Sequence, residues 1–175
     1  MHMDIHYWIQ HYGYIGIAFI LLLEMIGIPF PGETILIVSG IAWVTGELSL
    51  LPLLLFATLG NIAGCSLAYL LGRVFGRKLL LDYGRFVRLT PEKLEKAEHK
   101  FQKYQIAIVL FAKFLAGIRV LASYLAGVNR MSFLTFSLYN TAGSILWVTV
   151  FVVFGKYIEF AWMKYHSLLH QFFRG

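Results

Sequence analysis

Four ionisable residues interrupt otherwise apolar runs of this sequence: Glu24, Glu33, Lys113 and Arg119. A charge near the centre of a bilayer costs about 2.5–3.5 kcal/mol, so such a side chain normally faces a cavity or a partner. The two acids lie in one part of the chain and the two bases in another, so the charges can neutralise each other if those parts meet. Static buried salt bridges stay an alternative. We favour a wet, charged cavity that takes an anionic headgroup, because buried ion pairs stabilise a fold only weakly.

The composition indicates an integral membrane protein. The 175 residues are 59% hydrophobic and 14% charged, whereas soluble domains are about 45–50% apolar and about 25% charged. A chain of this size cannot bury so much apolar surface inside itself, so lipid must solvate part of it. A soluble domain is excluded, and a nucleic-acid partner is not expected despite the net charge of +6. The single cysteine, Cys65, excludes an internal disulfide, and we expect no metal ion and no other cofactor.

Breaks in the apolar runs predict two helical hairpins, over residues 12–44 and 106–128. The second arm of the first hairpin and both arms of the second are shorter than the ~20 residues that a membrane span needs. Both hairpins are therefore interpreted as re-entrant, entering and leaving the membrane on the same side. The turns are assigned to helix-breaking residues: Pro29, Pro31 and Gly32 in the first hairpin and Gly117 in the second.

Each hairpin is followed by an uncharged apolar segment that predicts a transmembrane helix, over residues 52–72 and 132–155. Residues 73–105 hold nine of the fifteen Lys and Arg residues, so the positive-inside bias places this segment in the cytoplasm. Within it, Thr90-Pro91-Glu92 predicts a helix start. The tail, residues 156–175, mixes aromatic and basic side chains and predicts an interfacial amphipathic helix.

The order of hairpin and span occurs twice, and the two spans share a motif. Asn61-Ile62-Ala63-Gly64 in the first corresponds to Asn140-Thr141-Ala142-Gly143 in the second. One span per copy makes the copies inverted, which is typical of transporters whose site lies where the copies meet. The expected fold is a single all-α membrane domain over residues 1–175, an inverted repeat of two re-entrant hairpins, each followed by a transmembrane helix.

The motifs resemble those of the DedA family, also called the VTT or SNARE-associated-like domain. They are Glu24 with Pro31-Gly32-Glu33, Gly60-xxx-Gly64-xxxx-Tyr69-xx-Gly72-Arg73, Lys113-Phe114-xxxx-Arg119, and Ala126-Gly127. The resemblance implies two facing re-entrant hairpins and lipid translocation across the bacterial cytoplasmic membrane, associated with the proton-motive force. It assigns substrate binding to Arg119 and Lys113 and proton coupling to Glu24 and Glu33. Lys113 and Ala116 stand where family members often have arginine and proline.

Three function classes stay open on the sequence alone. The first is a proton-coupled transporter of an anionic lipid, with undecaprenyl phosphate as the expected substrate. The second is a flippase or scramblase of a phospholipid such as phosphatidylethanolamine, and the third is a lipid-phosphate phosphatase. In the first class Arg119 binds the headgroup, Glu24 carries the proton and Glu33 is a static partner. Assembly into a homo-oligomer also stays open.

Overall fold

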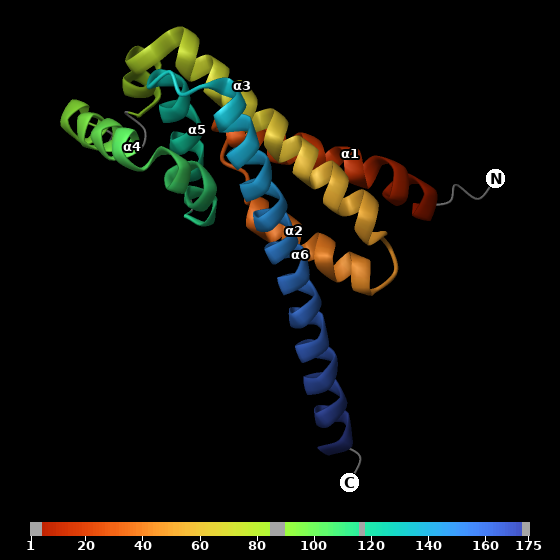
Figure 1. Cartoon of the computed structure of the whole chain (residues 1–175). Coiled ribbons are helices and arrows are strands. Elements are labelled where there is room, and N and C mark those ends of the chain that lie inside the picture. Colours follow the sequence, from red (N-terminus) through yellow and green to blue (C-terminus); the bar gives the residue numbers. More distant parts are fainter. Residues whose placement is uncertain (1–4, 85–89, 116–117, 173–175) are drawn as a thin grey trace.

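The computed structural model describes residues 5–84, 90–115 and 118–172, and every regular element in these ranges is a helix (Figure 1). This confirms the all-α class. The elements in chain order are α1 (Ile5–Ile26), α2 (Gly32–Val44), α3 (Leu50–Gly84), α4 (Pro91–Phe111), the short 3-10 helix η2 (Ala112–Phe114), α5 (Ile118–Val128) and α6 (Phe133–Phe172).

Two helices are long and apolar enough to cross a membrane, over Leu50–Lys78 in α3 and Phe133–Lys164 in α6. They cover the first span expected from the sequence, residues 52–72, and all but the first residue of the second, residues 132–155. The helices run in opposite directions (Figure 1) and cross where the hydroxyl of Ser144 donates a hydrogen bond of 2.8 Å to Oδ1 of Asn61. Large apolar side chains on both helices, such as Leu59 and Leu138, are exposed, as expected for surfaces that face lipid.

Both long helices continue past the boundaries expected from the sequence. In α3 the helix bends at Gly76, where φ is 60° and ψ is −151°, and then continues into the basic segment. In α6 residues 156–172 continue the same helix, so the tail is helical but is not a separate element. The expected boundary of the second span was Gly155, which the sequence analysis took as the end of the helix. It lies within α6 and packs against the backbone of Ile37 in α2.

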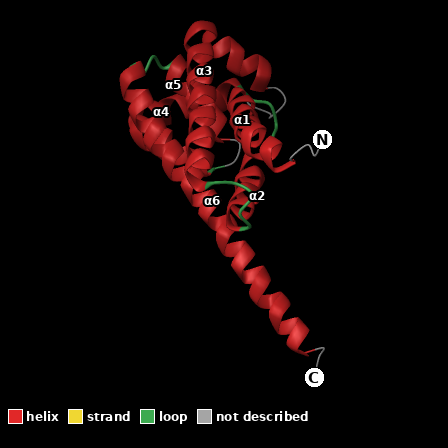
Figure 2. Ribbon diagram, turned by 90° about the vertical axis from the view of Figure 1, so that its right-hand side faces the viewer, coloured by secondary structure: helices red, strands yellow, loops and turns green. Residues whose placement is uncertain are grey.

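The arms of each predicted hairpin pack on different long helices (Figures 1 and 2). In the first hairpin α1 lies along α3, whereas α2 lies along α6. In the second, the end of α4 and η2 contact α6, whereas α5 lies along α3. The helix expected at Thr90 is confirmed, since the Thr90 side chain accepts a hydrogen bond of 3.3 Å from the N–H of Lys93. That helix bends at Tyr104, close to the expected start of the second hairpin.

Glycines bring the backbones of these pairs into direct contact. A Cβ on Gly72 of α3 would meet Tyr124 of α5, and a Cβ on Gly127 of α5 would meet Tyr69 of α3. Gly40 of α2 and Gly155 of α6 meet in the same reciprocal way. Small residues allow this close approach in membrane helices. The two pairs lie at corresponding places of the inverted repeat, which, like the re-entrant course of the hairpins, stays a prediction.

Gly60→Ala tests the contact between α3 and α1, because its Cβ would meet the backbone of Ala18. We expect this change to destabilise the protein by about 1–3 kcal/mol, the usual cost of overpacking. Gly16→Ala in α1 is the matched control, because a Cβ at Gly16 would meet no neighbouring helix or side chain within 4 Å. Thermal unfolding of the purified protein in detergent should show a lower Tm for Gly60→Ala only. Equal Tm values for both variants would contradict close helix contact at Gly60.

Candidate functional site

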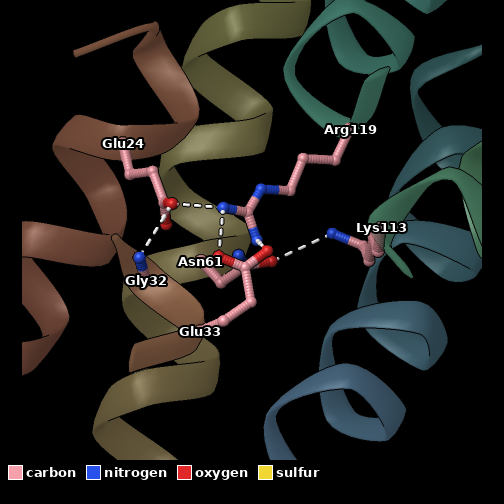
Figure 3. A network of polar contacts seen from close by, with 6 residues as sticks. All are labelled: Glu24, Gly32, Glu33, Asn61, Lys113 and Arg119. Carbon is pink, nitrogen blue, oxygen red and sulfur yellow. Dashed lines mark hydrogen bonds and ion pairs between the residues drawn. The ribbon is translucent and has the colours of Figure 1, made fainter. Parts of the chain in front are cut away.

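Arg119, in the first turn of α5, joins the two predicted hairpins by ion pairs with both acids (Figure 3). Its Nη2 donates to Oε1 of Glu24 in α1 and, at 3.1 Å, to Oε2 of Glu33 in α2. Its Nη1 lies 2.7 Å from Oε1 of Glu33. The sequence analysis expected the charges of the two hairpins to meet, and for these three residues they do.

The turn between α1 and α2 places the start of α2 beside Glu24. The N–H of Gly32 donates a hydrogen bond of 3.0 Å to Oε1 of Glu24, and Glu33 lies in the first helical turn. The positive end of the α2 helix dipole therefore lies against both carboxylates. A Cβ at position 32 would meet the Glu24 carboxylate, so a larger residue there would displace that side chain. Pro31 is the N-cap residue of α2, and Pro29 lies in the same non-helical segment.

Burial differs between the two acids. The side chains of Arg119 and Glu24 are 6% and 4% exposed, whereas that of Glu33 is 28% exposed. The Arg119 guanidinium also lies over the ring of Trp147 in α6, 4.9 Å from its centroid, a cation–π distance. Among the described residues, Oε2 of Glu24 is buried and has no hydrogen-bond partner. The three charged side chains thus form ion pairs with one another, instead of lining the open, wet cavity that the sequence analysis favoured.

Lys113 does not join this cluster. Its Nζ donates a hydrogen bond of 2.9 Å to Oδ1 of Asn61 and lies 3.3 Å from Sγ of Cys65. The lysine is buried, and none of the ion pairs within the described residues includes it. Because Asn61 also binds Ser144, Lys113 lies at the crossing of α3 and α6. The sequence analysis allowed Lys113 to neutralise the acids if the hairpins meet, and in this arrangement it does not: its ammonium reaches Asn61 of α3 instead.

Sequence reasoning missed Asn61 and Ser144 as members of the polar interior. The available signal was the Asn-x-Ala-Gly motif, which served only as a mark of the repeat. A polar side chain in an otherwise uncharged span is itself a signal, because it needs a partner in an apolar surrounding. Gly117, the predicted turn of the second hairpin, lies outside the described residues. No group of three His, Cys, Asp or Glu residues that could hold a metal ion occurs in the described ranges.

Comparison with known proteins decides the family. The family model described as the VTT domain matches residues 30–157. The chain belongs to the VTT-domain, or DedA, family. This confirms the resemblance found in the sequence motifs. The matched region includes Glu33, Lys113 and Arg119 and begins six residues after Glu24.

Several relatives of this VTT-domain protein are named as membrane proteins of bacteria. An uncharacterised membrane protein of Synechocystis is 36% identical over 143 residues, which are 82% of this chain and 66%, slightly under two thirds, of that protein. Undecaprenyl phosphate transporter A of Bacillus subtilis is 30% identical over 155 residues, 89% of this chain and 76% of the relative. An "alkaline phosphatase-like protein" of Lactococcus lactis is 31% identical over 168 residues, 93% of this chain and 78% of the relative. No solved structure gives a significant match.

Replacing each buried base by methionine should separate their structural roles. Arg119→Met leaves two carboxylates beside one another without a cation, and breaking a buried pair in this way costs about 3–5 kcal/mol. Lys113→Met removes a buried charge that has no acid partner among the described residues, and Asn61 keeps its hydrogen bond from Ser144. We expect the Tm in detergent to fall for Arg119→Met and to stay equal or rise for Lys113→Met. A similar fall for both would show that Lys113 has a counter-ion in the folded protein.

Proposed function

We propose that the protein moves an anionic lipid phosphate across the bacterial cytoplasmic membrane, with undecaprenyl phosphate as the substrate and proton uptake as the driving step. The observation that carries the proposal is the Arg119 guanidinium held between two carboxylates at the meeting of the two hairpins. Relatives named as undecaprenyl phosphate transporters in Bacillus subtilis and Staphylococcus aureus support the choice of lipid.

A buried arginine between two acids is suited to exchange its partners for a phosphate. The planar guanidinium presents several N–H donors in a fork that matches carboxylate and phosphate oxygens alike. In the closed arrangement Glu24 and Glu33 occupy these donors, so no uncompensated cation is left in the membrane. An arriving lipid phosphate replaces the Glu24 carboxylate without changing the type of interaction that Arg119 makes.

Glu24 is the better candidate for the coupled proton. It is the more deeply buried acid, and its Oε2 has no hydrogen-bond partner among the described residues. When phosphate takes over Arg119, an ionised Glu24 loses its main counter-ion, and burial then favours the neutral acid. One proton bound per lipid phosphate keeps the site near neutral through the cycle. Glu33, which is partly exposed, acts as the static partner that keeps Arg119 oriented.

The architecture supports alternating exposure of this site. Arg119 and the two acids come from three different helices, and α2 and α5 pack on opposite long helices. If the hairpins are re-entrant and inverted, the site lies near the midplane, where transporters of this kind bind their substrates. A shift of α2 with α6 relative to α5 with α3 would then open the ion pairs toward one face of the membrane.

A lipid-phosphate phosphatase is the second candidate, favoured by the name of the Lactococcus relatives. Hydrolysis would release inorganic phosphate from a lipid pyrophosphate, whereas transport moves the lipid intact. A phospholipid flippase or scramblase would use Arg119 in the same way but would act on phosphodiester headgroups. Liposomes with a panel of labelled lipids, combined with an assay for free phosphate, separate these three functions.

Flip of labelled undecaprenyl phosphate in liposomes that contain the purified protein tests the role of Arg119. Arg119→Lys keeps the charge but loses the fork, so we expect at least a tenfold slower flip, about the loss of one charge-assisted hydrogen bond. Lys100→Gln, which removes an exposed positive charge from α4, is the matched control and should flip lipid at the wild-type rate. Equal rates for Arg119→Lys and wild type would remove Arg119 from the substrate site.

Proton coupling is tested by comparing two isosteric changes, Glu24→Gln and Glu33→Gln. Glu24→Gln mimics the protonated acid, so flip should continue but should no longer depend on a pH gradient across the liposome membrane. Glu33→Gln should keep that dependence. The measurement is the flip rate with and without the gradient for wild type and both variants. Full gradient dependence in Glu24→Gln and its loss in Glu33→Gln would move the proton to Glu33.

A further inference from the structure

A second group of cations lies at the basic end of the molecule, away from Arg119. The bend of α3, helix α4 and the turn between α5 and α6 come together at one end of the molecule (Figure 1). Residues of these three segments line an open groove of about 530 Å³. This volume is in the range of small-molecule sites, about 300–1,000 Å³. We call it the arginine groove, and its side chains that matter here are Arg73, Phe75, Arg77, Glu98, Gln102 and Arg130.

The groove has an excess of positive charge. Arg77 pairs with Glu98, with Nε and Oε1 3.3 Å apart, and Glu98 is the one acid among the described residues that line the groove. Arg73 donates a hydrogen bond of 2.7 Å to the hydroxyl of Tyr69, which in turn donates to the carbonyl of Met131. These contacts hold Arg73 in place without neutralising it. Within the described part of the chain, Arg130 makes no ion pair.

Arg130 has a left-handed backbone conformation, which is unfavourable for a residue with a side chain. Helix α5 ends in a Schellman motif: the N–H of Arg130 donates to Gly127 and the N–H of Met131 to Ala126, both at 3.0 Å. The residue at this point of the motif takes the left-handed conformation, and it is usually glycine. Arg130 takes it with φ of 53°, the only positive φ of a non-glycine residue in the described ranges. Such strain at a residue that lines a groove indicates a use for the side chain.

The walls of the groove fit an amphiphile better than a free anion. Arginine forks match the oxygens of a phosphate group. Beside them, Val74 and Phe75 are 73% and 57% exposed and line the same groove, which gives an apolar surface for a lipid chain. The groove lies in the segment that the positive-inside bias assigns to the cytoplasm, and therefore at the level of lipid headgroups on that side.

Helix α5 connects this groove to Arg119. Arg119 lies in its first turn, and Val128, its last residue, lines the groove. The two positions are nine residues apart along the helix, a rise of about 14 Å, or roughly half of the ~30 Å hydrocarbon layer. Gly72 and Gly127 hold this end of α5 directly against α3, so the two cationic positions keep a fixed separation.

We propose that the arginine groove is a second anion site, which binds the phosphate group of a membrane lipid at the cytoplasmic interface. The binding of a lipid phosphate in the groove does not depend on the proposed transport function. A role of the groove in holding the lipid before or after it binds Arg119 rests on that function. Arg130 and Arg73 supply the donors, Arg77 is held by Glu98, and the exposed apolar side chains of α3 contact the lipid chain.

Calorimetric titration of the full chain in neutral detergent tests the binding. The probes are dioctanoyl phosphatidic acid, inorganic phosphate and dioctanoylglycerol, so that lipid phosphate, free phosphate and the lipid chain alone are compared. Phosphatidic acid should bind, and Arg130→Gly should weaken it about tenfold. The same change should raise Tm by about 2–4 °C, because glycine removes the strain of the left-handed conformation. Lys100→Gln, which removes an exposed positive charge from α4, should leave this binding unchanged.

Each other outcome overturns the proposal. Unchanged affinity in Arg130→Gly removes the residue from any site. An equal loss in Lys100→Gln means that surface charge alone attracts the lipid, and equal affinity for inorganic phosphate means that the groove selects a free anion. Failure of the transport proposal looks different: wild-type liposomes would not flip lipid although the groove binds it. If both hold, Arg130→Gly should slow flip at a low lipid fraction and recover at a high one.

Discussion

The structure depends on neutralising one guanidinium in an apolar surrounding. Arg119 cannot lose its charge, because a guanidinium stays protonated in proteins. Two carboxylates from α1 and α2 therefore have to reach it. This requirement fixes how the two hairpins meet, since α1 packs on α3 and α2 on α6, and Arg119 is on α5. The turn at Pro31-Gly32 follows from the same requirement, because Gly32 leaves space for the carboxylate that the arginine needs.

Lys113 illustrates a different solution to the same problem. It is buried with an amide oxygen and a thiol as neighbours, and both are weaker partners for a cation than a carboxylate. An arginine at this place would bring a planar fork to an interior where Lys113 contacts one oxygen acceptor, Oδ1 of Asn61, which Ser144 shares, and one weak sulfur acceptor, Sγ of Cys65. The compact ammonium of lysine suits this narrow place at the crossing of the two long helices, and Gly143 provides room for its methylene chain.

Much of the fold could be predicted from the sequence, because helices that lipid solvates must be long and apolar, and such segments are visible in the sequence. The apolar lengths located α3 and α6, the Pro and Gly residues located the turn before α2, and Thr90 located the start of α4. The bend at Gly76 and the continuation of α6 past Gly155 could not be predicted. A glycine in an apolar run can mark the end of a helix, or it can lie within a helix where the backbone of another helix packs closely against it, and the sequence does not distinguish the two. Only the neighbouring chain, Ile37 for Gly155, decides between the two.

The site, too, could be predicted only in part. Charge in an apolar run marked Glu24, Glu33, Lys113 and Arg119 as residues that need partners, and this argument holds whatever the tertiary structure. It could not assign the partners, since the sequence does not say which arm packs on which helix. Lys113 could therefore have neutralised the acids on the sequence alone, and it lies instead beside Asn61. Arg130 was not singled out, because its strain is a property of the backbone and not of the residue type.

The length of α6 has a mechanical consequence. A helix of 40 residues is about 60 Å long, about twice the thickness of the hydrocarbon layer of ~30 Å. The helix must therefore tilt strongly or leave the bilayer, and beyond Gly155 it extends as a rod of roughly 25 Å. Gly155 is in backbone contact with α2, the helix that carries Glu33, so the rod and α2 are packed directly against each other at this point. A force or torque applied at the far end of α6 reaches the ion pairs without any flexible joint between them.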